Sequence, residues 1–376
     1  MNPPQILADS SYPVLKKYVL EHTGLDYYAP RDEDFAARMS RRLAALRARN
    51  CSEYLRRLRN DSIEIDALVG ELTIGETYFF RQNEHFDLLR TVIVPDLLRA
   101  NAETRELRIW SAGCATGAEP YSVAILLAQD FAGALQDWRV VLLGTDINPG
   151  FLAQAREGRF SRWALRDVPE NVLSAWFQRD GKQWILDPAI RDAVSFRYHN
   201  LTEDLSHPSP DGLPFDLILC RNVMIYFSAD RIRRLGARFH ELLRPGGWLL
   251  PGHAEYGLDA FPQFTLVREA SATVYRRIPP PEIPPPPVFE PPFPDITLPA
   301  VPSVFSPQKS ELHRPPPTVE DADDARILAD TGHWDDAAAI CERILERDSL
   351  NPTAHFTLAL VLAHRGLADE AMKQLR

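Results

Sequence analysis

The sequence has few cysteines, no excess of positive charge and no long apolar run, and each absence excludes a class of protein. The four cysteines are far apart and form no C-x-x-C pair, so we expect neither a metal site nor a disulfide-based fold. A formal charge of −10 argues against nucleic-acid binding. No apolar run approaches the ~20 residues that span a bilayer, and residues 1–11 do not resemble a signal peptide. A soluble, cytoplasmic protein without membrane insertion is the expectation.

Proline, in contrast, is abundant and concentrated. Of 32 prolines, 16 fall between Pro279 and Pro317. Repeated prolines restrict φ and remove backbone donors, so residues 279–319 are predicted to form an extended linker. Docking of a proline-binding module is a less favoured alternative. Because a chain of 376 residues is too long for a single hydrophobic core, the linker is expected to separate folded domains.

Residues 1–72 are predicted to form a helical domain. Apolar residues recur at helical spacing at Leu15 and Val19, and again at Phe35, Met39 and Leu43. Residues 31–60 contain nine arginines against four acidic residues, on a chain that is acidic overall. This excess of positive charge indicates either a solvated helix face or a basic surface that attracts an acidic partner.

Residues 73–278 alternate between predicted strands and helices. Apolar strands are predicted at residues 107–110, 139–146, 215–220 and 248–250, with helices at 119–131 and 230–243. This alternation predicts an α/β fold, a doubly wound, Rossmann-like and mostly parallel sheet with its ligand at the carboxyl ends of the strands. Residues 161–198 do not continue this alternation of strands and helices. They are rich in aromatic residues and have a predicted turn at Asp180-Gly181. They are predicted to form a small inserted β-subdomain.

Residues 320–376 contain an internal repeat with a period of 34 residues, as comparison of Ala325 with Ala359 and Gly332 with Gly366 shows. A helix-turn-helix period of this length indicates tetratricopeptide repeats, which are all-α. The second copy stops at Arg376, inside its second helix. Because such repeats need neighbours to bury their faces, we expect this sequence to be a fragment of a longer protein.

The candidate ligand site begins in the turn Ser111–Pro120, between a predicted strand and helix. Gly113 allows close approach of the backbone to a ligand. The turn matches neither G-x-G-x-x-G nor a P-loop, which disfavours a pyrophosphate cradle. Glu119 instead suits a cationic group, and Asp146, at the end of the next strand, can accept both hydroxyls of a ribose. Together these residues favour a nucleoside-type cofactor such as S-adenosylmethionine.

The sequence resembles the CheR-type chemoreceptor methyltransferases from its N-terminal helices to about Arg277. The motifs occur in family order and at family spacing: Gly75–Arg81, the glycine turn through Ser122, Gly144–Ile147, His199–Leu201, Cys220–Phe227, Leu243–Gly247 and Gly252–Glu255. The resemblance implies a class I methyltransferase sheet behind an N-terminal helical domain. The sequence departs from the family at Gly75, where many relatives have Asn, so no side-chain contact is expected at this position.

The resemblance also implies roles for individual residues. Arg81 and Tyr226 would act beside the transferred methyl group. The cofactor-binding roles are Thr77 and Arg81 at the methionine end, Glu119 near the ammonium, Asp146 at the ribose, Asn200 and Leu201 at the adenine, and Arg221 and Asn222 at the pocket floor. Phe79 and Phe80 are expected in the core, and Cys114 and Cys220 are expected to have no chemical role.

The implied reaction is methylation of glutamate side chains in the cytoplasmic helical domain of a chemoreceptor, with S-adenosylhomocysteine as the second product. The repeats could bind a further protein. The short turn Gln178–Lys182 argues against capture of a receptor tail. Two alternatives stay open: a methyltransferase of the same fold with another acceptor, and a non-catalytic module that binds S-adenosylmethionine or S-adenosylhomocysteine.

Overall fold

Two units make up the chain, Met1–Val288 and Phe289–Arg376. The computed structural model describes residues 1–202, 206–252, 255, 261–269, 272–278, 325, 334–347 and 351–364. Over these ranges, no helix combines the length and the apolar character that a bilayer crossing requires. The predicted linker, residues 279–319, lies outside the described residues.

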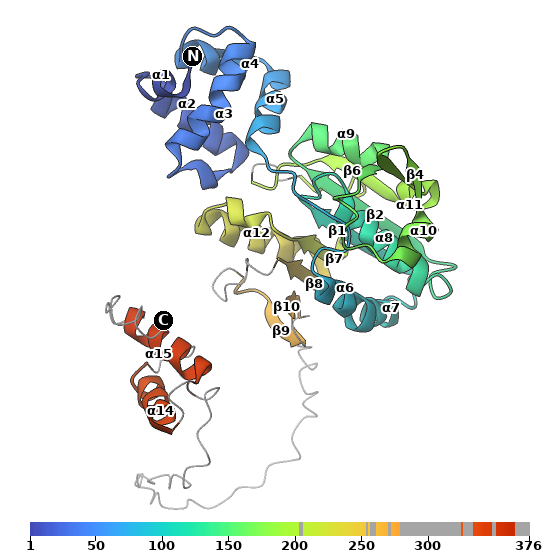
Figure 1. Ribbon diagram of the computed structural model, residues 1–376. Helices are drawn as coiled ribbons and strands as arrows, with labels where there is room; N and C mark the ends of the chain where they lie inside the picture. The colour runs from blue at the N-terminus through green and yellow to red at the C-terminus, as the bar shows by residue number, and fades with distance from the viewer. Residues whose placement is uncertain are drawn as a thin grey trace, which may run out of the picture. The chain divides into compact units, whose positions relative to one another are not determined.

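The N-terminal domain is a bundle of helices, as predicted (Figure 1). It contains α1 (Pro3–Leu7), α2 (Tyr12–Thr23), α3 (Asp32–Ala45), α4 (Cys51–Asn60) and α5 (Ser62–Leu72). The side chains predicted at helical spacing are buried: Leu15, Val19, Phe35, Met39 and Leu43. Side-chain caps from Asn50 and Asp61 begin α4 and α5, and Gly24, with φ of 73°, ends α2.

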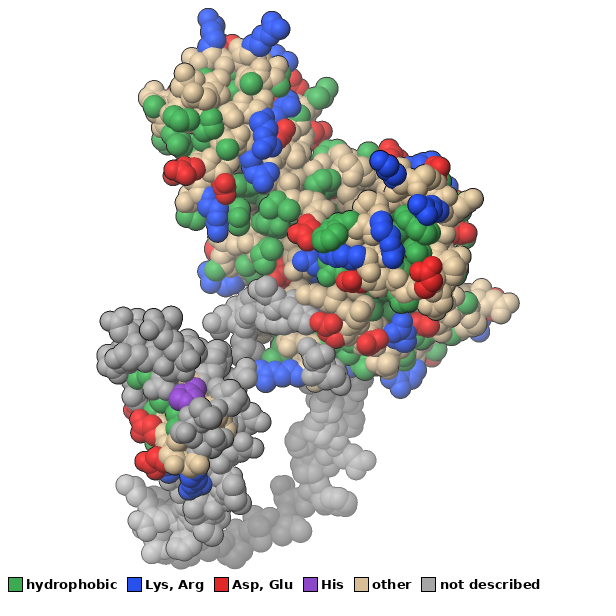
Figure 2. Space-filling model, in the orientation of Figure 1, with side chains coloured by type: hydrophobic (Ala, Val, Ile, Leu, Met, Phe, Trp, Pro, Cys, Tyr) green, Lys and Arg blue, Asp and Glu red, His purple; other side chains and the backbone are tan. Residues whose placement is uncertain are grey.

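The arginines of residues 31–60 have two different roles. Arg42 forms a buried ion pair with Glu64 at 2.6 Å. Arg41, Arg49 and Arg57 also pair with carboxylates of the same domain. Carboxylates of the same domain therefore balance part of the positive charge. The rest contributes to the basic side chains along one side of this domain in Figure 2.

The domain that follows the N-terminal helices is built on a seven-stranded sheet of order β6-β2-β1-β7-β8-β10-β9. The strands β6 (Val194–Tyr198), β2 (Arg139–Asp146), β1 (Glu106–Ala112), β7 (Phe215–Cys220) and β8 (Leu243–Pro251) are parallel, while β9 (Thr265–Glu269) and β10 (Ala272–Arg276) complete an antiparallel edge. The doubly wound α/β fold is therefore confirmed. The chain reverses its direction of winding between β1 and β7, and the carboxyl ends of these strands meet there.

Alternate residues of the strands face two separate hydrophobic cores. Ile109 and Leu217 face one core, which is shared with α6 (Asn83–Leu88), α7 (Val94–Ala100) and α8 (Ala118–Asp130). Trp110 and Ile218 face the other, beneath α12 (Ala229–Leu242). Because both faces are covered, the central strands are largely apolar, with Arg108 and Asp216 as buried exceptions, which explains why they could be predicted from the sequence.

The inserted subdomain is a three-stranded antiparallel sheet of order β3-β5-β4. It contains β3 (Arg159–Ser161), α10 (Glu170–Trp176), β4 (Phe177–Asp180) and β5 (Gln183–Leu186), with a turn at Gly181. Its position differs from the predicted 161–198 at the carboxyl end. After α11 (Pro188–Asp192), residues 194–198 form β6, which pairs with β2 in the main sheet. The alternating burial of this edge strand resembles that of a hairpin strand, so periodicity alone could not assign it.

The C-terminal unit contains α14 (Trp334–Arg347) and α15 (Pro352–His364), which pack against each other. Ala325 and Ala359, which the 34-residue comparison singles out, are buried. Gly332 and Gly366 lie outside the described residues. The tetratricopeptide assignment therefore stays a prediction.

Candidate active site

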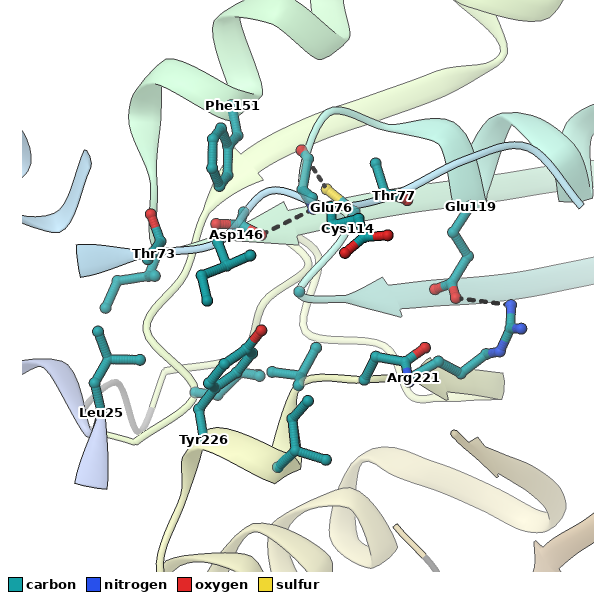
Figure 3. A pocket seen from close by; sticks show the side chains of 18 of the residues that line it. Leu25, Thr73, Glu76, Thr77, Cys114, Glu119, Asp146, Phe151, Arg221 and Tyr226 are labelled. Carbon is teal, nitrogen blue, oxygen red and sulfur yellow. Dashed lines mark hydrogen bonds and ion pairs between the residues drawn. The ribbon is translucent and has the colours of Figure 1, made fainter. Parts of the chain in front are cut away.

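A pocket of about 250 Å³ lies at the carboxyl ends of β1, β2 and β7. The segment between α5 and α6 covers one side of it, and Thr23 and Leu25 of the N-terminal domain contribute a wall (Figure 3). Every residue predicted for the site lines this pocket: Thr77, Arg81, Gly113, Glu119, Asp146, Asn200, Leu201, Arg221, Asn222 and Tyr226. The structure thus brings the predicted residues together, from five separate segments of the chain.

The glycine turn after β1 is held against β2. The amides of Gly113 and Cys114 both donate to the carbonyl of Thr145, at 2.8 and 2.9 Å. Gly113 has φ of 80°, and a Cβ at this position would clash with Val223. Glycine is therefore required here for both conformation and space, and its backbone can lie close to a ligand.

Asp146 is a buried carboxylate at the end of β2. Its two oxygens accept hydrogen bonds from the amides of Ala115 at 2.9 Å and Asn148 at 2.8 Å. Burial raises the pKa of Asp146, and these amides oppose that rise. Because each carboxylate oxygen has further lone pairs, the group can also accept from two vicinal hydroxyls. This arrangement suits a ribose.

Glu119 and Arg221 form an ion pair at the floor of the pocket, at 3.1 Å. Ser111 donates to the other oxygen of Glu119 at 2.7 Å. Arg221 also donates to the carbonyl of Arg81 and to the side chain of Gln82. Burial lowers the pKa of Arg221, and the Glu119 carboxylate opposes this shift. Glu119 therefore has protein partners of its own, and only its remaining lone pairs are left for a cationic ligand group.

Asn200 links the pocket to the N-terminal domain. Its amide nitrogen donates to the carbonyl of His22 at 2.8 Å, and its oxygen accepts from the backbone amide and the hydroxyl of Thr202. The side chain is therefore engaged within the protein. We infer that an adenine contact at Asn200 would come from its main chain.

Arg81 and Tyr226 both line the pocket. Arg81 lies between Phe80 and Gln82, which both have positive φ, at 56° and 62°. Such angles are costly for these residue types and are tolerated where tertiary contacts hold them. Burial raises the pKa of Tyr226, although the charge of Arg81 opposes the rise, so its phenol is neutral at physiological pH. The Tyr226 hydroxyl points into the cavity in Figure 3.

Glu255 supports the pocket from outside its lining, and no role was predicted for it from the sequence. One of its oxygens accepts from the amides of Val223, Met224 and Ile225, and the other accepts from Asn222 and Gly252, at 2.6 to 3.3 Å. This carboxylate therefore holds the loop that carries Asn222 and Tyr226. Its place at the end of the motif Gly252–Glu255 is the one feature of the sequence that could have indicated a role for Glu255.

The residues expected to have no chemical role behave as packing groups. Phe79 and Phe80 are buried in the core of the sheet domain. Cys114 and Cys220 are also buried, and burial raises the pKa of both thiols well above the ordinary value. A Cβ at Gly75 would lie 2.5 Å from the Phe151 ring, so the aromatic ring fills the space of the missing side chain.

Comparison with known proteins defines the class. The family model described as "CheR methyltransferase, SAM binding domain" matches residues 75–271, and "CheR methyltransferase, all-alpha domain" matches residues 11–73. Together with the fold and the pocket, these matches identify an enzyme that transfers methyl groups from S-adenosylmethionine. The chain belongs to the CheR methyltransferase family.

Named relatives cover the same two domains. A chemotaxis protein methyltransferase of Borreliella burgdorferi is 32% identical over 246 residues, which make up 64% of this chain and 86% of the relative. Chemotaxis protein methyltransferase 2 of Pseudomonas aeruginosa is 36% identical over 260 residues, 67% of this chain and 88% of the relative. The similarity therefore spans most of each relative.

The side chain of Asp146 gives a test of cofactor binding. We expect Asp146→Asn to weaken S-adenosylhomocysteine binding by about 10–100-fold, because hydrogen bonds to a charged group contribute about 1.5–3 kcal/mol. Titration calorimetry would measure the affinity. Asp137→Asn, at an exposed aspartate, is the control and should bind normally. An unchanged affinity in Asp146→Asn would show that the ribose lies elsewhere.

Proposed function

We propose that this protein transfers the methyl group of S-adenosylmethionine to glutamate side chains of a chemoreceptor, giving glutamate methyl esters. The family membership and the relatives named chemotaxis protein methyltransferase support this function. The observation that carries it is the contrast between the two pocket arginines. Arg221 is paired with Glu119, whereas no carboxylate of the described residues lies within 4.0 Å of Arg81. Arg81 can therefore hold an incoming carboxylate.

The chemistry of this acceptor requires little from the protein. S-adenosylmethionine supplies an activated methyl group. A glutamate side chain has an ordinary pKa of ~4.3 and is ionised at neutral pH, so no general base is needed. The remaining task is orientation of one carboxylate oxygen, which can lower the barrier by ~7–11 kcal/mol. In this proposal Arg81 holds the carboxylate, and the neutral phenol of Tyr226 packs or donates beside the reacting groups.

The acceptor in this proposal is the cytoplasmic helical domain of a receptor. Unpaired arginines of the N-terminal domain support it, because they attract an acidic partner. Arg31, for example, stacks on Tyr27 at 3.8 Å, and Tyr27 packs against Tyr226 of the pocket. The C-terminal unit is proposed to bind a further protein, as tetratricopeptide repeats commonly do.

Transfer of label from methyl-labelled S-adenosylmethionine tests this function. The purified protein would be incubated with membranes that contain the cognate receptors, and base-labile label would be collected as methanol. Label on a receptor band supports glutamate methyl-ester formation. Turnover on a free carboxylic acid alone would indicate a small-molecule methyltransferase. Binding of S-adenosylhomocysteine without turnover on any acceptor would indicate a non-catalytic module.

A further inference from the structure

A cluster of arginine and aromatic side chains lies beside the pocket, where the inserted subdomain meets the segment that carries Arg81. The Arg166 guanidinium lies 3.5 Å from the centre of the Tyr78 ring and 4.1 Å from that of Trp163. Tyr78 lines the pocket, whereas Trp163 is 64% exposed. We call Tyr78, Trp163 and Arg166 the Arg166 cluster.

The charge of Arg166 has no acidic partner in the described part of the chain. Its guanidinium donates to the carbonyl of Trp163 at 3.0 Å, and no described carboxylate lies within 4.0 Å of it. The nearby acids Glu76 and Asp167 are exposed and form no ion pair with it. In the same subdomain, Arg159 does pair with Asp180, at 2.9 Å. The cluster therefore presents a cation that aromatic stacking, rather than a salt bridge, holds in place.

The position of the cluster relates it to the acceptor. Arg81 also lies over the Tyr78 ring, at 5.5 Å from its centre. Since Arg166 is 3.5 Å from the same centre, the two guanidinium carbons are at most 9.0 Å apart. Residues one helical turn apart have Cβ atoms ~5–6 Å apart, and flexible acidic side chains extend this span. Two acidic residues on one helix face could thus reach Arg81 and Arg166 together.

We propose that the Arg166 cluster is a docking surface for a second acidic side chain of the acceptor helix, one turn from the glutamate that is methylated. The inference rests on the proposed function and adds a selection rule to it. The target carboxylate lies against Arg81, and the second carboxylate binds Arg166. Trp163, which is exposed and stacks on Arg166, contacts the apolar part of the helix beside the second carboxylate. The second carboxylate is bound and is not modified.

Steady-state kinetics with a purified receptor cytoplasmic fragment test this proposal. We expect Arg166→Ala to raise KM for the fragment about tenfold, which corresponds to about 1.4 kcal/mol. The value of kcat and the affinity for S-adenosylhomocysteine should stay within twofold. Trp163→Ala should raise KM by a smaller factor, about threefold. Arg99→Ala, which removes an exposed charge from α7 near the amino end of β1, is the matched control and should leave KM unchanged.

Changes in the receptor fragment separate docking from a structural effect. Fragments in which each acidic residue one turn from the methylated site is replaced by glutamine would be compared. One such replacement should raise KM of the unmodified enzyme about tenfold and have no further effect on Arg166→Ala. The proposal would be overturned if the receptor replacement and Arg166→Ala raised KM independently, so that their effects multiplied. An unchanged KM in Arg166→Ala would also overturn it.

Two further controls keep the outcome interpretable. Should Arg166→Ala fold poorly, Arg166→Gln removes the charge but keeps donors and most of the side-chain volume, and the same KM change is expected. Absence of methyl-ester formation by the unmodified enzyme would count against the proposed function itself. Methylation that is indifferent to Arg166 would count only against this inference.

Discussion

Replacement of Glu255 by alanine is expected to lower the free energy of unfolding by about 3–5 kcal/mol and to reduce methyl transfer at least about 100-fold. The carboxylate accepts five backbone amides, four of them from the loop of residues 222–225. Without it these donors lose their partner, and each of the buried ones, from Met224 and Gly252, costs about 1–3 kcal/mol when left unsatisfied. The loop would then no longer hold Tyr226 in the pocket.

Glu255→Gln distinguishes positioning from general destabilisation. A glutamine oxygen can still accept from Val223 and Met224, but its amide group would face the donors of Asn222 and Gly252. We therefore expect intermediate stability in urea unfolding and intermediate kcat. Asp146 lies at the end of a different strand, so S-adenosylhomocysteine should bind within about tenfold of normal in Glu255→Gln.

The matched control for these variants is Glu241→Ala, which removes a carboxylate that is 65% exposed on α12. It should leave both stability and turnover nearly unchanged. Normal turnover in Glu255→Ala would contradict the positioning role. A loss of stability with an unchanged kcat in the folded fraction would restrict Glu255 to a structural role.

The second large effect is expected for Arg81→Ala, with a loss of about 100–1000-fold in kcat/KM for the receptor. Removal of a preorganised group that stabilises the reacting charges typically costs about 2.7–4 kcal/mol. Two groups of Arg81 belong to the site, its main-chain carbonyl and its side chain. The carbonyl, which accepts from Arg221, is retained in the alanine variant. We therefore expect the affinity for S-adenosylhomocysteine to change less than about fivefold.

Single-turnover methyl transfer and titration calorimetry would measure these two quantities separately. Arg81→Lys, which keeps the charge but not the planar guanidinium, should recover only part of the rate. Equal losses of turnover and cofactor affinity in Arg81→Ala would assign Arg81 to cofactor binding instead. Unchanged kinetics would remove Arg81 from the mechanism.

Much of the fold and the site could be predicted because the signals are local. The buried strands β1, β2 and β7 are mostly apolar runs, and a parallel sheet places their carboxyl ends at one edge. Gly113 and Asp146 directly follow or end such strands, so their convergence on one pocket follows from the topology. The boundary of the insert was less predictable, since β6 has the alternating pattern of any half-buried strand.

The sequence by itself determined the central strands, the helices that follow them and the chemical groups at the strand ends, because helical and strand periodicity are properties of neighbouring residues. Only the tertiary structure decided which charges have partners. It paired Arg42 with Glu64 and Arg221 with Glu119, and left Arg81 and Arg166 without described carboxylates. Glu255 reaches amides at least 30 residues away along the chain. Such pairings depend on how distant segments pack, and local sequence patterns carry no record of that packing.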